Sequence, residues 1–303
     1  MDKCKVLVPI GCRSDEGLSK PIIKRLKEDD FFDVRILNIN PYNISLSYFS
    51  WFETFEDCYP DFQHWEDHWK PDLAFITGDR IEITAVAYQA FHNNVPIAHY
   101  FAGVLTDPMT NLDNLNRHCI SLWSEIQFVE SFECGLNVIK LFNAIGKKRN
   151  VYEVGITHLE DLEIDTSLVP KHSYDLVLYN PPTLYDFQLQ KKDVRELYEI
   201  QKSIKNKAII LDPNPDPKAI FLPVTYPNLP RPQFLGLLKW CSRFITNSSS
   251  AIYEAPYFLK KEQIVMVGDR NKNRTRFTYE KTDKLASEKI VKILKDWWID
   301  KNE

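Results

Sequence analysis

The chain has 303 residues, of which 44% are hydrophobic and 26% charged, and its formal net charge is -4. This composition predicts a globular protein with room for two domains, and the acidic balance disfavours a nucleic-acid partner. The N-terminal apolar run is too short for a signal peptide, and we expect no membrane span. The six cysteines form no CxxC pair, so we expect no disulfide framework, no zinc site and a reduced, cytoplasmic setting.

The first half of the chain alternates short apolar strands with helical segments. A polar loop is predicted at 12–20. Helices are predicted over 21–29, within the aromatic-rich segment 41–70, over 81–94, from Arg117 onward and over 134–145. Strands are predicted at 5–11, 33–39, 72–79, 95–103, 126–129 and 149–156. Strand–helix alternation of this kind is typical of a parallel α/β domain.

The second half repeats the pattern. Strands are predicted at 174–182, 207–217, 244–246 and 263–269, and helices at 193–204, 234–242, from Ser250 onward and at 286–301. The fold class is therefore α/β with two Rossmann-like, doubly wound domains. We expect an N-terminal domain over 1–165, a C-terminal domain over 166–282 and a final helix over 283–303 that returns to the first domain. The linker is expected near 160–173.

The stretch TNSSSAIYEAP (246–256) places three serines directly after an apolar strand. Small polar residues at that point make turns and helix N-caps. A second reading is an anion site, because hydroxyl and backbone N–H groups at a helix N-terminus suit a phosphate. Ligands of doubly wound sheets sit at the carboxyl ends of the strands, where this stretch, GCRSD and GDR all lie, and this favours the second reading.

Several segments, in order along the chain, resemble the UDP-N-acetylglucosamine 2-epimerase family, and its hydrolysing branch in particular. They are KVLVPIGCRSDEG, KPDLAFITGDRIEITAVAYQAFHNNVPIAH, NRHCISLWSEIQFV, DPNPDP, ITNSSSAIYEAPYF and VGDRNKNR. The resemblance implies the glycosyltransferase-B architecture, in which two Rossmann-like domains face a cleft. It also implies a reaction in which the sugar C2 proton is removed, UDP is eliminated to leave a glycal, and UDP or water adds back with C2 inverted.

The resemblance also implies where the nucleotide binds. The residues that match the family's UDP site are Arg13, Ser248, Ser249, Ser250, Glu254 and Arg270. The serines would meet the phosphates, Glu254 would accept hydrogen bonds from the ribose hydroxyls, and Arg13 would reach the diphosphate from the other domain. Read without the resemblance, Arg13 is a loop residue and Glu254 a charge near a helix end.

The chain departs from the family at positions that carry proton transfer. Phe101 and Val104 stand where its two branches have glutamate, Asn114 replaces an acid, and Asn180 replaces a histidine. None of these side chains transfers protons at neutral pH.

Acidic candidates for catalysis remain at three positions, namely Asp79, Glu82 and Asp113. Other readings stay open: Asp79 as a helix N-cap, Glu82 as a first-turn charge, and the nearby His118 as a packed helical residue. His64 and His68 have metal-binding spacing but no third ligand nearby, so we expect a solvated helix there and no metal or other cofactor.

Three functions therefore remain open. The first is an epimerase-type enzyme acting on a UDP-N-acetylhexosamine with a rearranged set of acids. The second is a glycosyltransferase that uses a UDP-sugar donor, and the third is a catalytically weakened UDP-sugar-binding protein. We expect a UDP-sugar as the partner, no nucleic acid and no membrane, and a homodimer stays open.

Overall fold

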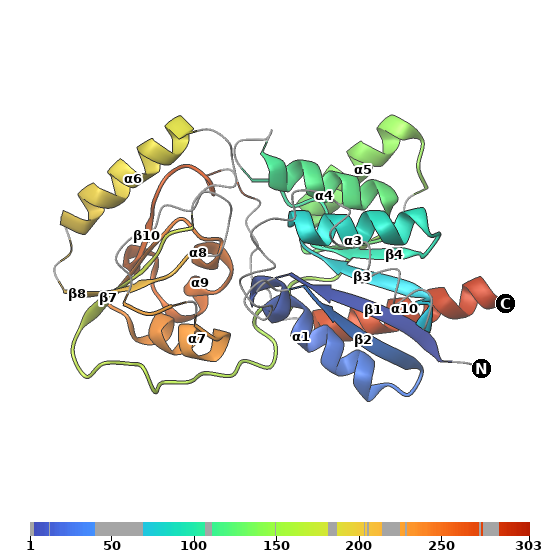
Figure 1. The fold of residues 1–303 in the computed structure, drawn as a ribbon, viewed down its shortest axis with the longest axis horizontal. Helices are drawn as coiled ribbons and strands as arrows, with labels where there is room; N and C mark the ends of the chain where they lie inside the picture. The colour runs from blue at the N-terminus through green and yellow to red at the C-terminus, as the bar shows by residue number, and fades with distance from the viewer. Residues whose placement is uncertain are drawn as a thin grey trace. The chain divides into compact units, whose positions relative to one another are not determined.

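The computed structural model describes residues 3–11, 13–39, 69–106, 111–148, 150–180, 187–202, 204, 206–213, 225–227, 229–272, 274 and 285–303. The chain divides into two compact units (Figure 1). The first comprises Met1–Leu105, Asp113–Glu160 and Thr278–Glu303, and the second comprises Thr106–Leu112 and Asp161–Phe277. Residues 40–68, which include nearly all of the segment 41–70 with its predicted helix, lie outside the described residues. Within the described ranges, no helix is long and apolar enough to cross a membrane.

The first unit is built on a six-stranded parallel sheet with the strand order β2-β1-β3-β4-β5-β6. Its strands are β1 (Cys4–Ile10), β2 (Phe32–Asn38), β3 (Leu73–Thr77), β4 (Ile97–Tyr100), β5 (Ile126–Val129) and β6 (Val151–Glu153). The helices between them are α1 (Arg13–Glu28), α3 (Ile81–His92), α4 (Leu112–Trp123) and α5 (Phe132–Ile145). β1, β3 and β4 are buried along almost their whole length, as parallel strands covered on both faces are.

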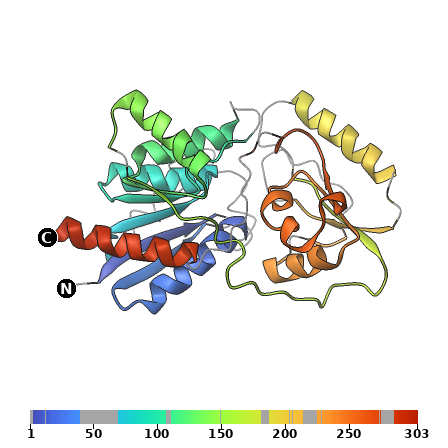
Figure 2. The same ribbon diagram turned by 180° about the vertical axis from the view of Figure 1, so that it is seen from behind.

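The C-terminal helix α10 (Ala286–Asn302) belongs to the first unit and packs against α1 (Figure 2). At its N-terminal end, Glu160 accepts hydrogen bonds from the backbone N–H and the hydroxyl of Ser287. Farther along, Lys295 forms an ion pair with Asp29 at 2.9 Å. The end of the chain is thereby fixed to the segment that leaves the first sheet.

The first predicted helix is longer than the sequence suggested. We expected a polar loop at 12–20 and a helix from Pro21, but α1 begins at Arg13 and Pro21 lies inside it. Buried Leu18, Ile22 and Leu26 recur every four residues, which is one face of a helix, and the acidic first turn suits the helix dipole. The polar composition of this turn concealed its helical spacing.

The second unit contains a four-stranded parallel sheet with the order β10-β9-β7-β8. The strands are β7 (Tyr174–Leu178), β8 (Lys207–Leu211), β9 (Arg243–Thr246) and β10 (Ile264–Met266). The helices are α6 (Phe187–Lys202), α7 (Arg231–Trp240), α8 (Ser250–Tyr253) and α9 (Ala255–Phe258), with a short 3-10 turn at Lys261–Gln263. Residues of β7, β8, β9 and α7 contribute most of one apolar core cluster, which α8 and α9 complete.

The helix predicted from Ser250 onward is wrong as one continuous element. It is split into the single turns α8 and α9, and Glu254 stands at the junction with φ -111° and ψ -46°. Pro256 is in the first turn of α9. Proline has no N–H to donate, and its ring clashes with the carbonyl four residues earlier, so the first turn cannot extend through it.

Candidate active site

The carboxyl ends of β1, β3 and β4 meet at one edge of the first sheet. Gly11 follows β1, Gly78 and Asp79 follow β3, and Phe101 follows β4. The strands are in register there, since Thr77 pairs with Tyr100 and the N–H of Gly78 donates to the Tyr100 carbonyl at 3.2 Å. This is the edge at which doubly wound sheets bind ligands.

Asp79 forms an ion pair with Arg117 of α4. The Arg117 side chain is 3% exposed and that of Asp79 is 19% exposed. The same guanidinium also donates to the carbonyl of Val104 and, at 3.4 Å, to the side-chain oxygen of Asn114. Asp79 is not the N-cap of α3, a position that Arg80 occupies. The sequence motif GDR therefore brings a carboxylate to the sheet edge in its ionised, arginine-bound form.

Glu82 forms a second carboxylate–arginine pair at the same edge, with Arg80 as its partner. The residue is only 5% exposed. A Cβ at Gly11 would lie 3.0 Å from the Glu82 carboxylate and 3.1 Å from that of Asp15, so both acidic side chains lie next to this glycine. Asp15 also accepts the Gly11 N–H at 3.2 Å. Sequence reasoning did not select Asp15 as a site residue, although it ends the quoted GCRSD motif.

Asp113 lies in the first turn of α4 and is half-buried, while its neighbour Asn114 is fully buried. Phe101 and Val104, which stand at the family's acidic positions, are 4% and 0% exposed. Phe101 has φ 70°, a backbone conformation that few residues other than glycine adopt. The residue directly after β4 thus has an unusual backbone conformation at one of the positions where the family's acid is replaced.

His99 lies one layer below the edge and is completely buried. Its Nε2 is 3.0 Å from the Gly78 carbonyl, which only accepts, so Nε2 carries the proton and Nδ1 accepts from Ser121. Burial lowers the pKa of His99 to about 4, so the ring is neutral. His118 is half-buried, and burial together with Arg117 lowers its pKa as well.

The predicted nucleotide site lies in the second unit, where the serines form a tight turn. The hydroxyl of Thr246 accepts the Ser248 N–H at 2.9 Å, and the Ser248 hydroxyl accepts the Ser250 N–H at 3.2 Å. Ser248 is buried, whereas Ser249 and Ser250 are partly exposed. The turn reading of these serines is therefore correct for Ser248, which shapes the loop through its own hydroxyl.

Glu254 is 8% exposed and pairs with Arg231, the first residue of α7, at 2.9 Å. The sequence analysis did not select Arg231. The one signal for it is indirect: a buried carboxylate such as Glu254 needs a cationic partner somewhere in the chain. Arg270 is half-buried in the loop after β10. Arg13 is the first residue of α1, and its side chain lies outside the described part of the chain.

Asn180, which replaces the family's histidine, is held at its backbone. Its N–H donates to the side-chain oxygen of Asn247 at 2.8 Å, and its carbonyl accepts from the same amide. Asn271 in turn donates to the Asn247 carbonyl at 2.6 Å. One amide thus ties the loop after β7 to the serine turn after β9.

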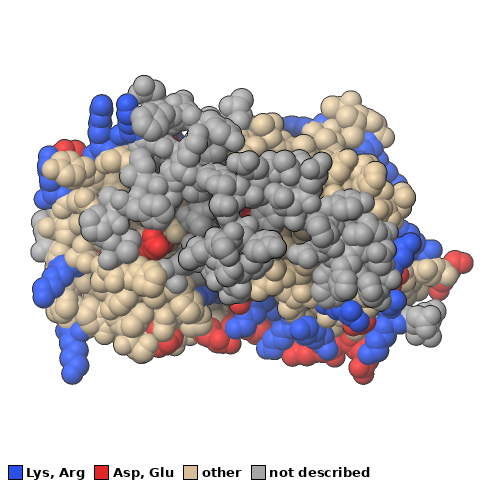
Figure 3. All heavy atoms as spheres, in the orientation of Figure 1, with Lys and Arg blue, Asp and Glu red and all other residues tan. Residues whose placement is uncertain are grey.

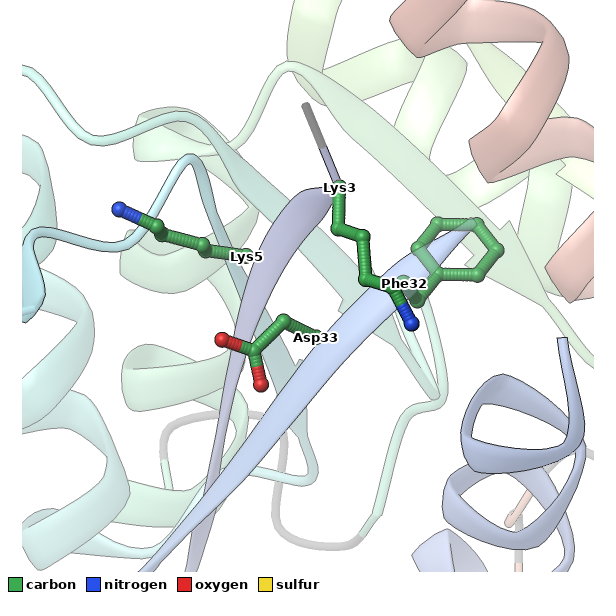
Figure 4. A pocket seen from close by; sticks show the side chains of 4 residues that line it. All are labelled: Lys3, Lys5, Phe32 and Asp33. Atoms are coloured by element: carbon green, nitrogen blue, oxygen red, sulfur yellow. The ribbon is translucent and has the colours of Figure 1, made fainter. Parts of the chain in front are cut away.

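Other surfaces offer weaker candidates. A depression of about 410 Å³ is lined by Lys3, Lys5, Phe32 and Asp33 (Figure 4). It lies at the amino ends of β1 and β2, opposite the ligand edge, and Asp33 is already bound by the indole N–H of Trp69 at 2.8 Å. We assign no site to it.

Two further kinds of feature bear on metal and nucleic-acid binding. Among the described residues, no group of three or more His, Cys, Asp and Glu side chains could hold a metal ion. His64 and His68 lie outside them. On the face shown in Figure 3, basic and acidic side chains lie interspersed along the lower edge.

Comparison with known proteins supports the resemblance seen in the motifs. The sequence model of a family described as UDP-N-acetylglucosamine 2-epimerase matches residues 57–302. The GDP/UDP-N,N'-diacetylbacillosamine 2-epimerase (hydrolyzing) of Campylobacter jejuni is 27% identical over 281 residues, which is 85% of this chain and 70% of that protein. The UDP-N,N'-diacetylbacillosamine 2-epimerase (hydrolyzing) of Legionella pneumophila is 25% identical over 321 residues, 90% of this chain and 83% of that protein.

Among solved structures, the UDP-GlcNAc 2-epimerase of Methanocaldococcus jannaschii, in complex with UDP-GlcNAc and UDP, is similar with a TM-score of 0.66 and 17% identity. The likeness covers 96% of this chain and 99% of that chain, and it confirms the predicted α/β fold class. The family match spans most of the sequence and confirms the family predicted from the motifs. The chain therefore belongs to the UDP-N-acetylglucosamine 2-epimerase family of sugar-nucleotide enzymes.

Proposed function

We propose that this protein acts on a UDP-linked N-acetylhexosamine by removing the C2 proton, eliminating UDP and inverting C2. The observation that carries the proposal is Asp79, an ionised carboxylate at the carboxyl end of β3 that is oriented by Arg117. A fixed carboxylate is suited to accept a proton, and Glu82 with Arg80 supplies a second one nearby in the chain. Asp113, in the first turn of α4, is the third acidic candidate.

We assign UDP to the second unit. The diphosphate would lie against the turn of Ser248, Ser249 and Ser250, and Arg270 and Arg13 would supply cationic contacts. Glu254 would accept the ribose hydroxyls. Its pairing with Arg231 supports this role, because the guanidinium fixes the orientation of the carboxylate.

We favour the hydrolysing outcome, in which water and not UDP adds to C1. The two curated relatives named above are both hydrolyzing 2-epimerases. The expected products are then UDP and a free N-acetylated sugar with inverted C2. The reaction as proposed needs no metal and no coenzyme, so turnover should persist after treatment with EDTA. A homodimer and a cytoplasmic location stay predictions.

The experiment that tests the function is proton exchange at sugar C2 in heavy water, followed by NMR with UDP-N-acetylglucosamine and UDP-N,N'-diacetylbacillosamine as substrates. Deuterium at C2, together with UDP and an inverted free sugar, is the expected result. UDP release without C2 exchange, and only when an acceptor is added, would identify a glycosyltransferase. UDP binding with neither exchange nor release would identify a binding protein.

A further inference from the structure

His158 occupies a fixed place in the first unit that the motif analysis did not single out. It follows Thr157, whose backbone N–H donates to the Tyr100 hydroxyl at 3.0 Å and whose own hydroxyl donates to the Leu18 carbonyl at 2.7 Å. These bonds join the segment after β6 to β4 and to α1. His158 itself is 8% exposed.

The imidazole of His158 packs edge-to-face on the ring of Phe101, with ring centroids 5.2 Å apart and an interplanar angle of 65°. Phe101 is the first residue after β4, and the neighbouring strand β3 ends in Gly78 and Asp79. His158 therefore belongs to the edge of the sheet that carries the arginine-bound carboxylates.

This edge has two carboxylates held by arginines, and His158 adds a different kind of group. Asp79 and Glu82 each pair with an arginine, and a carboxylate held in a fixed position is suited to accept the C2 proton. Burial holds His99 neutral below the edge, and its two hydrogen bonds fix the orientation of the ring. An imidazole is the side chain that most readily carries a donatable proton near neutral pH.

We propose that His158 is the proton donor that completes C2 inversion, an inference that rests on the proposed function. In the first half-reaction Asp79 accepts the C2 proton, the C–H electron pair forms the C1=C2 bond, and the C1–O pair leaves with UDP. In the second, the imidazolium of His158 donates a proton to C2 on the opposite face. Water then adds to the C1 cation and loses its proton to bulk solvent, and Asp79 and His158 exchange protons with solvent to return to their starting forms.

A donor in the second half-reaction has a signature that a structural residue lacks. In His158→Gln, C2 deprotonation and UDP release should stay within about threefold of the unsubstituted protein. Formation of the free inverted sugar should fall by about 10²-fold or more, the usual effect of losing a positioned acid. The 1,2-unsaturated sugar should therefore accumulate, and NMR detects its vinylic C1 proton in the same sample that reports UDP.

Chemical rescue and a matched control complete the test. In His158→Ala, added imidazole should restore the free sugar at the expense of the unsaturated sugar. His172→Gln, which changes an exposed histidine of the second unit, should leave the product ratio unchanged. Thermal unfolding confirms that each variant is folded.

Two results would overturn the inference while leaving the proposed function intact. One is an unchanged ratio of unsaturated to free sugar in His158→Gln. The other is an equal loss of UDP release and sugar formation without imidazole rescue, which would make His158 a packing residue. If the unsubstituted protein shows neither C2 exchange nor UDP release with either sugar nucleotide, the proposed function fails and this inference fails with it.

Discussion

The carboxylate of Glu254 accepts hydrogen bonds from two nitrogens of the Arg231 guanidinium, at 2.9 and 3.3 Å. Both residues are largely buried, with side chains 10% and 20% exposed. Glu254 stands between the turns α8 and α9, where Pro256 interrupts the helix, and Arg231 begins α7. The ion pair therefore fixes a carboxylate that the local helix would otherwise leave loosely placed.

Replacing this carboxylate should weaken nucleotide binding. We expect Glu254→Ala to reduce UDP affinity by about 1.5–3 kcal/mol, the range for hydrogen bonds to a charged group. The variant should also lose its preference for UDP over 2'-deoxy-UDP, because the lost bonds go to ribose hydroxyls. Calorimetry measures both, and Glu262→Ala, an exposed acid in the 3-10 turn, is the matched control. Unchanged UDP affinity in Glu254→Ala would contradict the ribose assignment.

Neutralising Asp79 should stop chemistry without stopping binding. We expect Asp79→Asn to lower the rate of C2 deuterium exchange by about 10²–10⁴-fold, because an amide does not accept the proton. UDP affinity should be unaffected, since Asp79 is not among the residues assigned to the nucleotide. The control is Asp30→Asn, an exposed acid paired with Lys3 at 3.7 Å. Exchange at the unsubstituted rate in Asp79→Asn would exclude it as the base.

Restoring the family's histidine should raise turnover. Asn247 holds the backbone of residue 180 on both its N–H and its carbonyl, so a new side chain there starts from a fixed position. We expect Asn180→His to increase kcat/KM by at least about tenfold, part of the usual effect of a positioned acid or base. Steady-state release of UDP measures it. A variant that is folded, binds UDP and turns over no faster would show that the present acid–base set does not use this position.

Acid should destabilise the first unit through His99. Burial lowers the pKa of His99 to about 4 from an ordinary value of 6.5, so the unfolded chain takes up the proton first. The contribution of the neutral ring is fully present above pH 6.5 and is lost as the pH falls from 6.5 towards 4. The loss amounts to about 3 kcal/mol between pH 7.5 and pH 4. Urea unfolding of the parent and His99→Gln at both pH values isolates this contribution, and equal pH dependence in the two would refute it.

A methyl group at Gly236 should destabilise the second unit. A Cβ there would lie 1.9 Å from the Asp165 carbonyl oxygen, because the segment after Glu160 packs directly on α7. We expect Gly236→Ala to cost about 1–3 kcal/mol of unfolding free energy, the usual effect of overpacking. Gly135→Ala in α5 is the matched control, since its nearest neighbours would be at an ordinary 3.6 Å. Thermal unfolding compares the two variants. Equal stability would show that the backbone at Asp165 moves to make room for the methyl group.

The fold could be predicted from the sequence to a large extent. Short β-branched runs alternating with helical spacing gave the parallel strands of both sheets, because a strand buried on both faces must be apolar throughout. Element ends were less predictable. The first turn of α1 is polar enough to suggest a loop, and the break at Glu254 depends on how Pro256 is accommodated.

The sequence motifs selected candidate site residues, but they did not predict which side chains these residues contact. Motifs in the sequence identified Asp79, Glu82 and the serine turn. The partners of these residues come from elsewhere in the chain: Arg117 is 38 positions from Asp79, and Arg231 is 23 positions from Glu254. Spacing in a sequence carries no information about such pairs, because they form only when separate strands and helices pack.

The sequence by itself determined that this chain folds as parallel α/β and belongs to a family of sugar-nucleotide enzymes. Both follow from local patterns, because strands, helices and motifs are short contiguous stretches of the chain. Only the tertiary structure decided the burial and the interaction partners of each candidate group. It placed a guanidinium on Asp79 and on Glu82, buried His99 as a neutral ring and brought His158 onto Phe101. Proton-transfer chemistry depends on burial and on neighbouring charges, and these exist only after distant segments have come together.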